Sequence, residues 1–200
     1  MKKIIVLFIT FNSISFQLSA TAVIVLIFPG RIILSVDSRM TYTDNLTGKR
    51  NFRTECKLST VNNFAYSFTG YRGYSGNVSA KYGNFNTDTY IKKILIKQTI
   101  SLNQTFSELV DGLEKELTSQ MKVLRKLNFK DYNHYFKENN GNFINLIVIG
   151  NDNGIPFAFA LNATLTELNG TPAVKAKASV FENKTIIIHA GVTDAVAKYI

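Results

Sequence analysis

The sequence predicts a single α+β domain, in which a block of strands is followed by helices and then by further strands. Three observations support this fold class. The chain has 200 residues, of which 46% are hydrophobic and 18% are charged, so it can bury one substantial core and is not disordered as a whole. Runs of β-branched and aromatic residues, separated by turn residues, occur toward both ends of the sequence. Between them the spacing of apolar residues becomes helical, and the sequence contains no internal repeat.

The N-terminal segment has the three-part order of a secretory signal peptide. A start containing two lysines is followed by a strongly apolar run, and the small residues Ser19 and Ala20 close the segment. The apolar run is shorter than the about 20 residues that a membrane-spanning helix needs. A buried N-terminal strand is the alternative interpretation. We expect residues 1–20 to be a signal peptide, residues 21–200 to form the domain, and the processed chain to be secreted or periplasmic.

Two cleavage points are compatible with this segment. Cleavage after Ala20 would leave Thr21 as the first residue, whereas cleavage after Ala22 fits the rule of small residues better and would remove Thr21. The formal charge of the chain is +9, and removal of the two leading lysines gives 9 − 2 = +7. The sequence leaves both cleavage points open.

The first block of strands is expected to form two hairpins. The four strands are predicted at residues 21–28, 31–36, 57–61 and 64–69. The dipeptides Pro29-Gly30 and Asn62-Asn63 supply the two turns. The stretch from about residue 38 to residue 55 is polar and predicts a loop between the hairpins.

Two helices are expected in the middle of the chain, at residues 87–100 and 105–127. The second is the clearer one, because Thr105 and Glu108 have the spacing of a capping box. We interpret its apolar stripe as core packing, because polar residues fill the other side. The stripe consists of Phe106, Leu109, Val110, Leu113, Leu117, Met121 and Leu124. The stretches before and after the two helices, 71–86 and 128–142, predict irregular connections.

The last block returns to strands. They are predicted at residues 143–149, 155–163, 174–180 and 185–189. Turn residues ending in Asn153-Gly154 separate the first pair, and Asn169-Gly170 is a strong hairpin signal for the next. Residues 193–200 begin an amphipathic helix that has no cap, which leaves open that the domain is incomplete at Ile200.

Several classes of chemistry are excluded by composition. Cys56 is the single cysteine, so no intrachain disulfide can form, and His134 and His189 lie far apart in the sequence. We therefore expect neither a metal site nor a cofactor. The basic excess would permit binding to nucleic acid or to an anionic surface, but the lysines and arginines are scattered over many elements. Nucleic acid is not expected as a partner.

Three features of the first two hairpins stand out as candidate chemistry. They are a potential N-terminal Thr21, the tripeptide Asp37-Ser38-Arg39 at the end of a strand, and Lys57 at the start of the next one. Each has a structural explanation when taken alone. Asp-Ser is a good turn former, an arginine is often a solvated charge, and a lysine at a strand edge limits aggregation.

Together these residues resemble the proteasome β-subunit group of N-terminal nucleophile (Ntn) hydrolases. In that family a strand that begins with threonine leads into a second strand ending Asp-Ser-Arg, a lysine opens the third strand, and a glycine closes the fourth. Here Asp37 follows Thr21 by 37 − 21 = 16 residues, and Lys57 and Gly70 stand at the expected later points. Residues 147–154 look like the family's pattern of an apolar strand followed by Gly, an aromatic or polar residue, Asp, two variable residues and Gly. The chain looks most similar to secreted bacterial proteasome-like proteins.

The resemblance implies a four-layer αββα sandwich of two mainly antiparallel sheets and a threonine-type hydrolysis of an amide or peptide bond. Thr21 would be both nucleophile and base, since a free α-amine has a pKa of about 7.7–8.0 and can accept the hydroxyl proton. By the same resemblance, Lys57 would activate the hydroxyl electrostatically, Asp37 would hold that lysine, and Arg39 would maintain the local geometry. The backbone N–H of Gly70 would stabilise the oxyanion.

Some positions differ from the family pattern. The residue after the nucleophile is Ala22 rather than threonine, and the family's Gly-Ser-Gly turn appears here as His189-Ala190-Gly191, without the serine. A catalytically inactive interaction or structural protein of the cell envelope is therefore the alternative function. Proteasome relatives assemble into rings, so a homo-oligomer is an assembly that the resemblance allows.

Overall fold

The structure is a computed structural model, which describes residues 23–28, 30–36, 39–43, 50–54, 57–73, 85–97, 101–138, 141–182 and 186–190. For residues 39–43, 50–54 and 186–190 only the backbone is described. The predicted signal peptide, Thr21, Asp37 and the predicted helix at 193–200 lie outside these ranges. Every structural statement below concerns the described residues.

The described chain is a mixed α+β protein, which confirms the predicted fold class. The strands are β1 (Val23–Phe28), β2 (Arg31–Val36), β3 (Arg39–Thr43), β4 (Arg50–Thr54), β5 (Ser59–Val61), β6 (Phe64–Gly70), β7 (Asn142–Asp152), β8 (Ile155–Leu168), β9 (Thr171–Glu182) and β10 (Ile186–Ala190). The helices are α2 (Thr87–Ile96), α3 (Leu102–Leu127), α4 (Phe129–Asn133) and the π-helical turn η2 (His134–Glu138).

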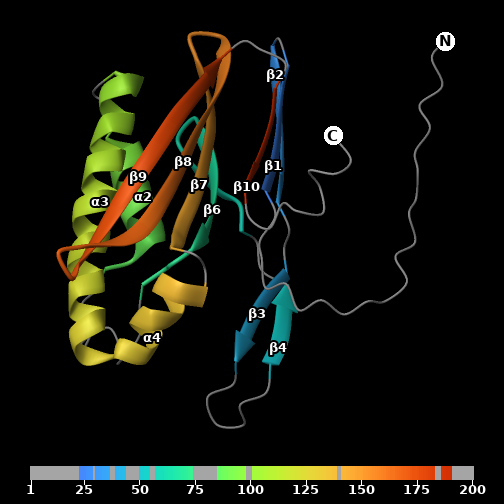
Figure 1. The fold of residues 1–200 in the computed structure, drawn as a ribbon. Coiled ribbons are helices and arrows are strands. Elements are labelled where there is room, and N and C mark those ends of the chain that lie inside the picture. The colour runs from blue at the N-terminus through green and yellow to red at the C-terminus, as the bar shows by residue number, and fades with distance from the viewer. Residues whose placement is uncertain are drawn as a thin grey trace.

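The described strands form three antiparallel sheets. A five-stranded sheet has the order β5-β6-β7-β8-β9, a three-stranded sheet has the order β10-β1-β2, and β3 pairs with β4 alone. Helices α2 and α3 cover one face of the five-stranded sheet, and the three-stranded sheet lies against its other face (Figure 1). The described chain therefore has three layers in the order helix, sheet, sheet.

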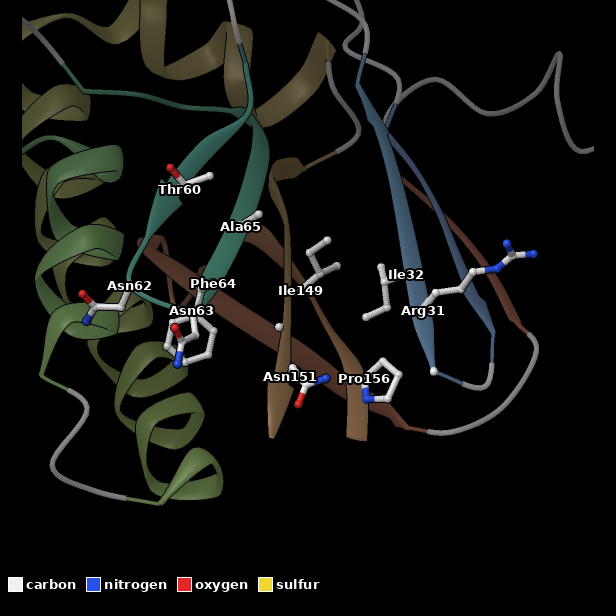
Figure 2. Close-up of a pocket in the computed structure, with 12 residues that line it drawn as sticks. Arg31, Ile32, Thr60, Asn62, Asn63, Phe64, Ala65, Ile149, Asn151 and Pro156 are labelled. Carbon is white, nitrogen blue, oxygen red and sulfur yellow. The ribbon is translucent and has the colours of Figure 1, made fainter. Parts of the chain in front are cut away.

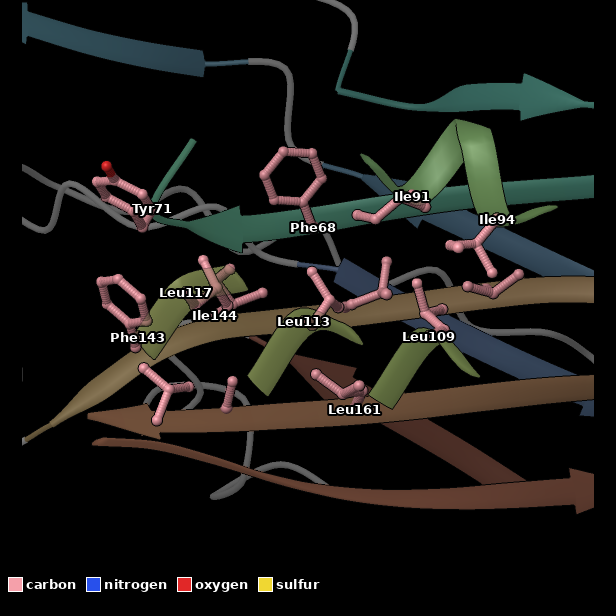
Figure 3. Close-up of a cluster of buried hydrophobic side chains, with 14 of the residues drawn as sticks. Phe68, Tyr71, Ile91, Ile94, Leu109, Leu113, Leu117, Phe143, Ile144 and Leu161 are labelled. Carbon is pink, nitrogen blue, oxygen red and sulfur yellow. The ribbon is translucent and has the colours of Figure 1, made fainter. Parts of the chain in front are cut away.

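The larger core lies between the helices and the five-stranded sheet. The predicted stripe of α3 faces this sheet, and Leu109, Leu113 and Leu117 are completely buried (Figure 3). Phe106 stacks on Phe159 of β8 with ring centroids 4.2 Å apart. The core-packing interpretation of the stripe is confirmed, except that Val110 is only partly buried.

The smaller core lies between the two larger sheets. Alternate residues of β1 (Val23, Val25 and Ile27) are buried against Ile147 and Ala158, as the two-residue period of a strand requires. The opposite face of the three-stranded sheet is also apolar but is not fully covered by described residues. It carries half-buried positions in β1 and an exposed isoleucine in β2; these are Ile24, Leu26, Phe28 and Ile33.

Both predicted Asn-Gly turns of the last block are confirmed. Asn153 and Gly154 have φ values of 51° and 88°, and Asn169 and Gly170 have φ values of 50° and 71°. Type I′ turns require two such residues, which is why this dipeptide favours hairpins. The turns fix the registers Asp152↔Ile155 and Leu168↔Thr171, and the rest of both ladders follows.

The edge strand β9 is partly sealed by α3. The backbone N–H of Val174 donates to Thr118 Oγ1 at 2.9 Å, and that of Ala176 donates to Glu114 Oε1 at 2.7 Å. Helix side chains thereby satisfy donors that an edge strand would otherwise present to solvent. This arrangement also fixes the position of α3 across the sheet.

The polar loop predicted between the first two hairpins is wrong in part, because the segment contains β3 and β4. Arg39 pairs with Thr54, and Thr43 pairs with Arg50. Threonine, tyrosine and phenylalanine in these strands favour the extended conformation. The abundance of polar residues concealed this preference.

Two helical predictions also need correction. Helix α3 begins at Leu102, with Ser101 as its N-cap, and Thr105 lies inside the helix because its N–H donates to the Ser101 carbonyl. The predicted capping box is therefore wrong. The connection predicted at 128–142 contains α4 and η2, because Asn128 caps α4 and Tyr132 is buried.

A hydrogen-bonded cluster attaches α2 to the five-stranded sheet. Asp88, in the first turn of α2, accepts hydrogen bonds from Tyr66 Oη at 2.6 Å and from Lys92 Nζ at 2.8 Å, and a longer one from Ser59 Oγ. Partial burial raises the pKa of Asp88, whereas the hydrogen bonds from Lys92 and Tyr66 lower it. The lowering is larger than the rise, so the pKa of Asp88 lies below its ordinary value.

Replacement of this carboxylate gives a testable prediction for stability. Asp88→Asn is expected to lower the free energy of unfolding at pH 7 by about 1–2 kcal/mol, because hydrogen bonds to a charged acceptor are lost. The folded-state pKa is depressed, so this stabilisation is present above the ordinary carboxyl pKa of about 3.9 and is lost as the pH falls through the folded pKa. Urea denaturation of both proteins between pH 7 and pH 3 should show the difference shrinking. The exposed Asp152→Asn serves as the control, and a difference that does not change with pH would contradict the assignment.

Candidate functional site

One end of the sheet sandwich carries an open cleft of about 400 Å³. Its lining brings the β1–β2 turn at Gly30 beside the β5–β6 turn at Asn62 and the β7–β8 end at Asn151 (Figure 2). The start of β1, the end of β2, the start of β5 and the end of β6 therefore share the opposite end of the sandwich. We call this opposite end the Gly70 end.

The elements that carry the predicted site residues converge on the Gly70 end. Val23 and Val36 are register partners. Val23 lies two residues after Thr21 in the sequence, and Val36 lies one residue before Asp37. Thr21 and Asp37 themselves lie outside the described residues. Arg39 begins β3 opposite Thr54, and only its backbone is described.

Lys57 is almost completely buried, with 8% of its surface exposed. It lies two residues before β5, at the Gly70 end. Burial of an ammonium group is costly unless the group is paired or hydrogen-bonded. The structural alternative, in which an exposed lysine protects a strand edge, does not fit this burial.

Gly70 has a backbone reason to be glycine. Its φ is +101°, and a Cβ atom at this position would overlap the carbonyl oxygen of Phe143. The neighbouring N–H of Tyr71 donates to that same carbonyl at 3.0 Å. The identity of residue 70 thus follows from chain packing, independently of any role of its N–H.

A position at which this sequence differs from the proteasome pattern, Ala190 of β10, lies at the same end. Ala190 is the register partner of Val23. In the resemblance, residue 190 replaces a serine that would supply a hydroxyl next to the nucleophile. This chain has no hydroxyl at that register position.

The cleft at the other end of the sandwich contains none of the predicted site residues. Ile32 points across it toward Ile149, whereas the Arg31 side chain points away from the cleft (Figure 2). The Arg31 guanidinium lies 4.9 Å from the ring centre of Phe28. The cleft is thus the open end of an apolar inter-sheet core rather than a charged site.

A polar row on the five-stranded sheet was missed by the sequence analysis. Thr69, Asn145, Asn162 and Lys177 are successive register partners on β6, β7, β8 and β9. Asn162 Nδ2 donates to Asn145 Oδ1 at 2.6 Å, and Asn145 Nδ2 donates to Thr69 Oγ1 at 3.5 Å. The row lies on the face that carries Ile147 and Ala158, next to Gly70, and all its members are at least partly exposed.

Two Asn-Gly turns could have identified most of this row. In an antiparallel hairpin without a bulge, the residue numbers of paired positions always have the same sum. The pair Asp152 and Ile155 gives 307, and 145 + 162 gives the same sum, so this turn predicts that Asn145 pairs with Asn162. The second turn gives 168 + 171 = 339, which equals 162 + 177. The pairing of Thr69 with Asn145 could not be found in this way, because helices separate β6 from β7 in the sequence.

The described residues give no sign of a metal site or a membrane span. They contain no group of three or more His, Cys, Asp or Glu side chains that could hold a metal ion. None of the described helices is both long and apolar enough to cross a membrane.

Comparison of the chain with protein-family models, with curated proteins and with solved structures gave no match in any of the three. The resemblance to the proteasome β-subunit group therefore depends on the sequence motifs alone.

Proposed function

We propose that this chain is a secreted threonine-type amide or peptide hydrolase, in which signal-peptide cleavage releases Thr21 as nucleophile and base. Lys57 would stabilise the deprotonated hydroxyl, Asp37 would hold Lys57, Arg39 would maintain the local geometry, and the Gly70 N–H would stabilise the oxyanion. The acyl group of the substrate would pass to the threonine oxygen as the amine leaves, and water would then release the acid.

One observation carries the proposal, namely the convergence of four elements at the Gly70 end. The segments that follow Thr21, precede Asp37 and contain Lys57 and Gly70 come from distant parts of the sequence. Their common location supports the motif-based roles. The burial of Lys57 adds to this support, because buried charged groups often occur at functional sites.

The proposal includes the complete four-layer αββα sandwich. Three layers are present in the described residues, and a further helical layer would cover the outer face of the three-stranded sheet. The apolar side chains of Leu26, Phe28 and Ile33 on that face support such a cover.

An inactive envelope protein with the same fold is the second candidate function. The observation that favours it is Ala190, which lies opposite Val23 in the register and lacks the hydroxyl of the family's serine. Such a protein would keep the sandwich while having no turnover.

The N-terminus of the exported protein decides between the two cleavage points. We expect mass spectrometry of the protein exported by a bacterial host to give a mature chain that begins at Thr21 with an unmodified amine. A chain that begins at Val23, or that keeps its leader, has no amine-assisted threonine and would refute the proposed mechanism. Chemical acetylation of the α-amine should likewise abolish turnover of amide substrates.

A further inference from the structure

The polar row described above occupies an unusual position for a layer between two sheets. Facing sheets normally bury apolar residues, as Val25, Ile147 and Ala158 do here. Toward the Gly70 end the same face changes to hydroxyl and amide side chains. Thr69, Asn145 and Asn162 are half-buried, so they are neither ordinary surface residues nor core residues.

Ser67 gives a second, independent observation at this place. It lies on the same face of β6, two residues before Thr69, and is 1% exposed. Its Oγ has no hydrogen-bond partner in the structure. A buried hydroxyl without a partner is unfavourable, and such groups are rare unless a water molecule or a ligand completes them.

The row and Ser67 together offer both donors and acceptors. Thr69 accepts from Asn145, which leaves its O–H able to donate, and Ser67 has its full capacity available. The Oδ1 atoms of Asn145 and Asn162 can each accept two hydrogen bonds. Asn145 Oδ1 accepts one from Asn162, and Asn162 Oδ1 accepts one from Thr164, so each oxygen has a second lone pair for a ligand.

We propose that Ser67, Thr69, Asn145 and Asn162 form a subsite for a neutral primary carboxamide, such as an asparagine or glutamine side chain of the substrate. This inference rests on the proposed function, because it makes the row part of the hydrolase's substrate site. The carboxamide oxygen accepts from the two hydroxyls, and its NH₂ group donates to an asparagine Oδ1.

Other side-chain classes match these groups less well. A carboxylate has no donor for the asparagine oxygens. An ammonium can donate to the hydroxyl and asparagine oxygens but cannot accept from either O–H group, so it matches only part of the set. An apolar side chain would leave the buried Ser67 hydroxyl without a partner and would offer nothing to the remaining donor and acceptor positions of Thr69, Asn145 and Asn162. Sites that hydrogen-bond their substrate reject such analogues strongly. The leucine side chain is the suitable comparison, because it has nearly the shape of asparagine.

The test is a binding titration that does not depend on turnover. Thr21→Ala protein beginning at residue 21 is labelled with ¹⁵N, and the side-chain NH₂ resonances of Asn145 and Asn162 are followed. N-acetyl-asparagine methylamide should shift these resonances saturably, whereas N-acetyl-leucine methylamide should not. Thr69→Val should weaken the binding of the asparagine ligand by about three- to tenfold, the effect of one neutral hydrogen bond.

Thr60→Val is the matched control. Thr60 pairs with Ala65 on the same face, but at the end that carries the open cleft, so binding should be unchanged. Ser67→Ala is the second test variant should Thr69→Val fail to fold. Equal shifts with both ligands, or no shift with either, would mean that the row is only structural and would overturn the subsite. Failure of the unmutated chain to hydrolyse any amide would instead refute the proposed function, and the titration would still decide the subsite.

Discussion

Replacement of Thr21 by alanine, in a chain that begins at residue 21, is expected to reduce amide hydrolysis by a factor on the order of 10⁶. The substitution removes the hydroxyl that would form the acyl intermediate and leaves the α-amine in place. Thr21 precedes β1, and the first described residue, Val23, is held in both the β10 and β2 ladders. The fold should therefore tolerate the change, and a panel of fluorogenic peptide amides provides the measurement.

Two further variants make this result specific. Thr21→Ser keeps a hydroxyl beside the amine and should retain a measurable part of the activity, together with a burst of released amine. Thr60→Ala replaces an exposed threonine of β5 at the other end of the sandwich and should behave like the unmutated chain. Equal activity of Thr21→Ala and the unmutated chain would exclude the threonine mechanism and leave the inactive or a different function.

The strands and the main helix were predictable because each has a local signal. Alternating burial in β1 and the apolar stripe of α3 depend on short-range periodicity, and the two Asn-Gly turns adopt positive φ values that few other residues accept. The strands β3 and β4 were missed because their residues are mainly polar. Met40 and Tyr42 are the only alternating pair in β3, and β4 has a single aromatic residue, Phe52, so the strand signal is short and weak.

The candidate site was predictable only as a set of separate motifs. Sequence spacing suggested Lys57 and Gly70, but it gave no indication that Lys57 is buried or that Gly70 lies against Phe143. The polar row needed the pairing of β6 with β7, which connects Thr69 to a residue 76 positions later. Contacts of that separation are set by packing of the whole domain and not by local sequence.

Gly70→Ala is expected to destabilise the fold strongly. A φ of +101° disfavours any side chain by about 1–2 kcal/mol, and the overlap of Cβ with the Phe143 carbonyl should add roughly 1–3 kcal/mol, because backbone atoms on both strands must move. Gly154→Ala is the matched control. Gly154 has a φ of +88° with nothing within 4 Å of the new Cβ, so only the conformational penalty applies. Urea denaturation of the two variants should therefore differ by the overlap contribution alone.

The same pair of variants separates two reasons for the glycine. If residue 70 is glycine only because of chain packing, activity per folded molecule should be preserved in Gly70→Ala once the variant is stabilised by low temperature. If its N–H also stabilises the oxyanion, the strand shift that relieves the overlap should displace that N–H and reduce the rate by about 10²-fold, as the loss of one oxyanion donor does elsewhere. Equal free energies of unfolding for Gly70→Ala and Gly154→Ala would show that β6 does not approach β7 as described, and the Gly70 end would then lack the geometry on which the proposed mechanism depends.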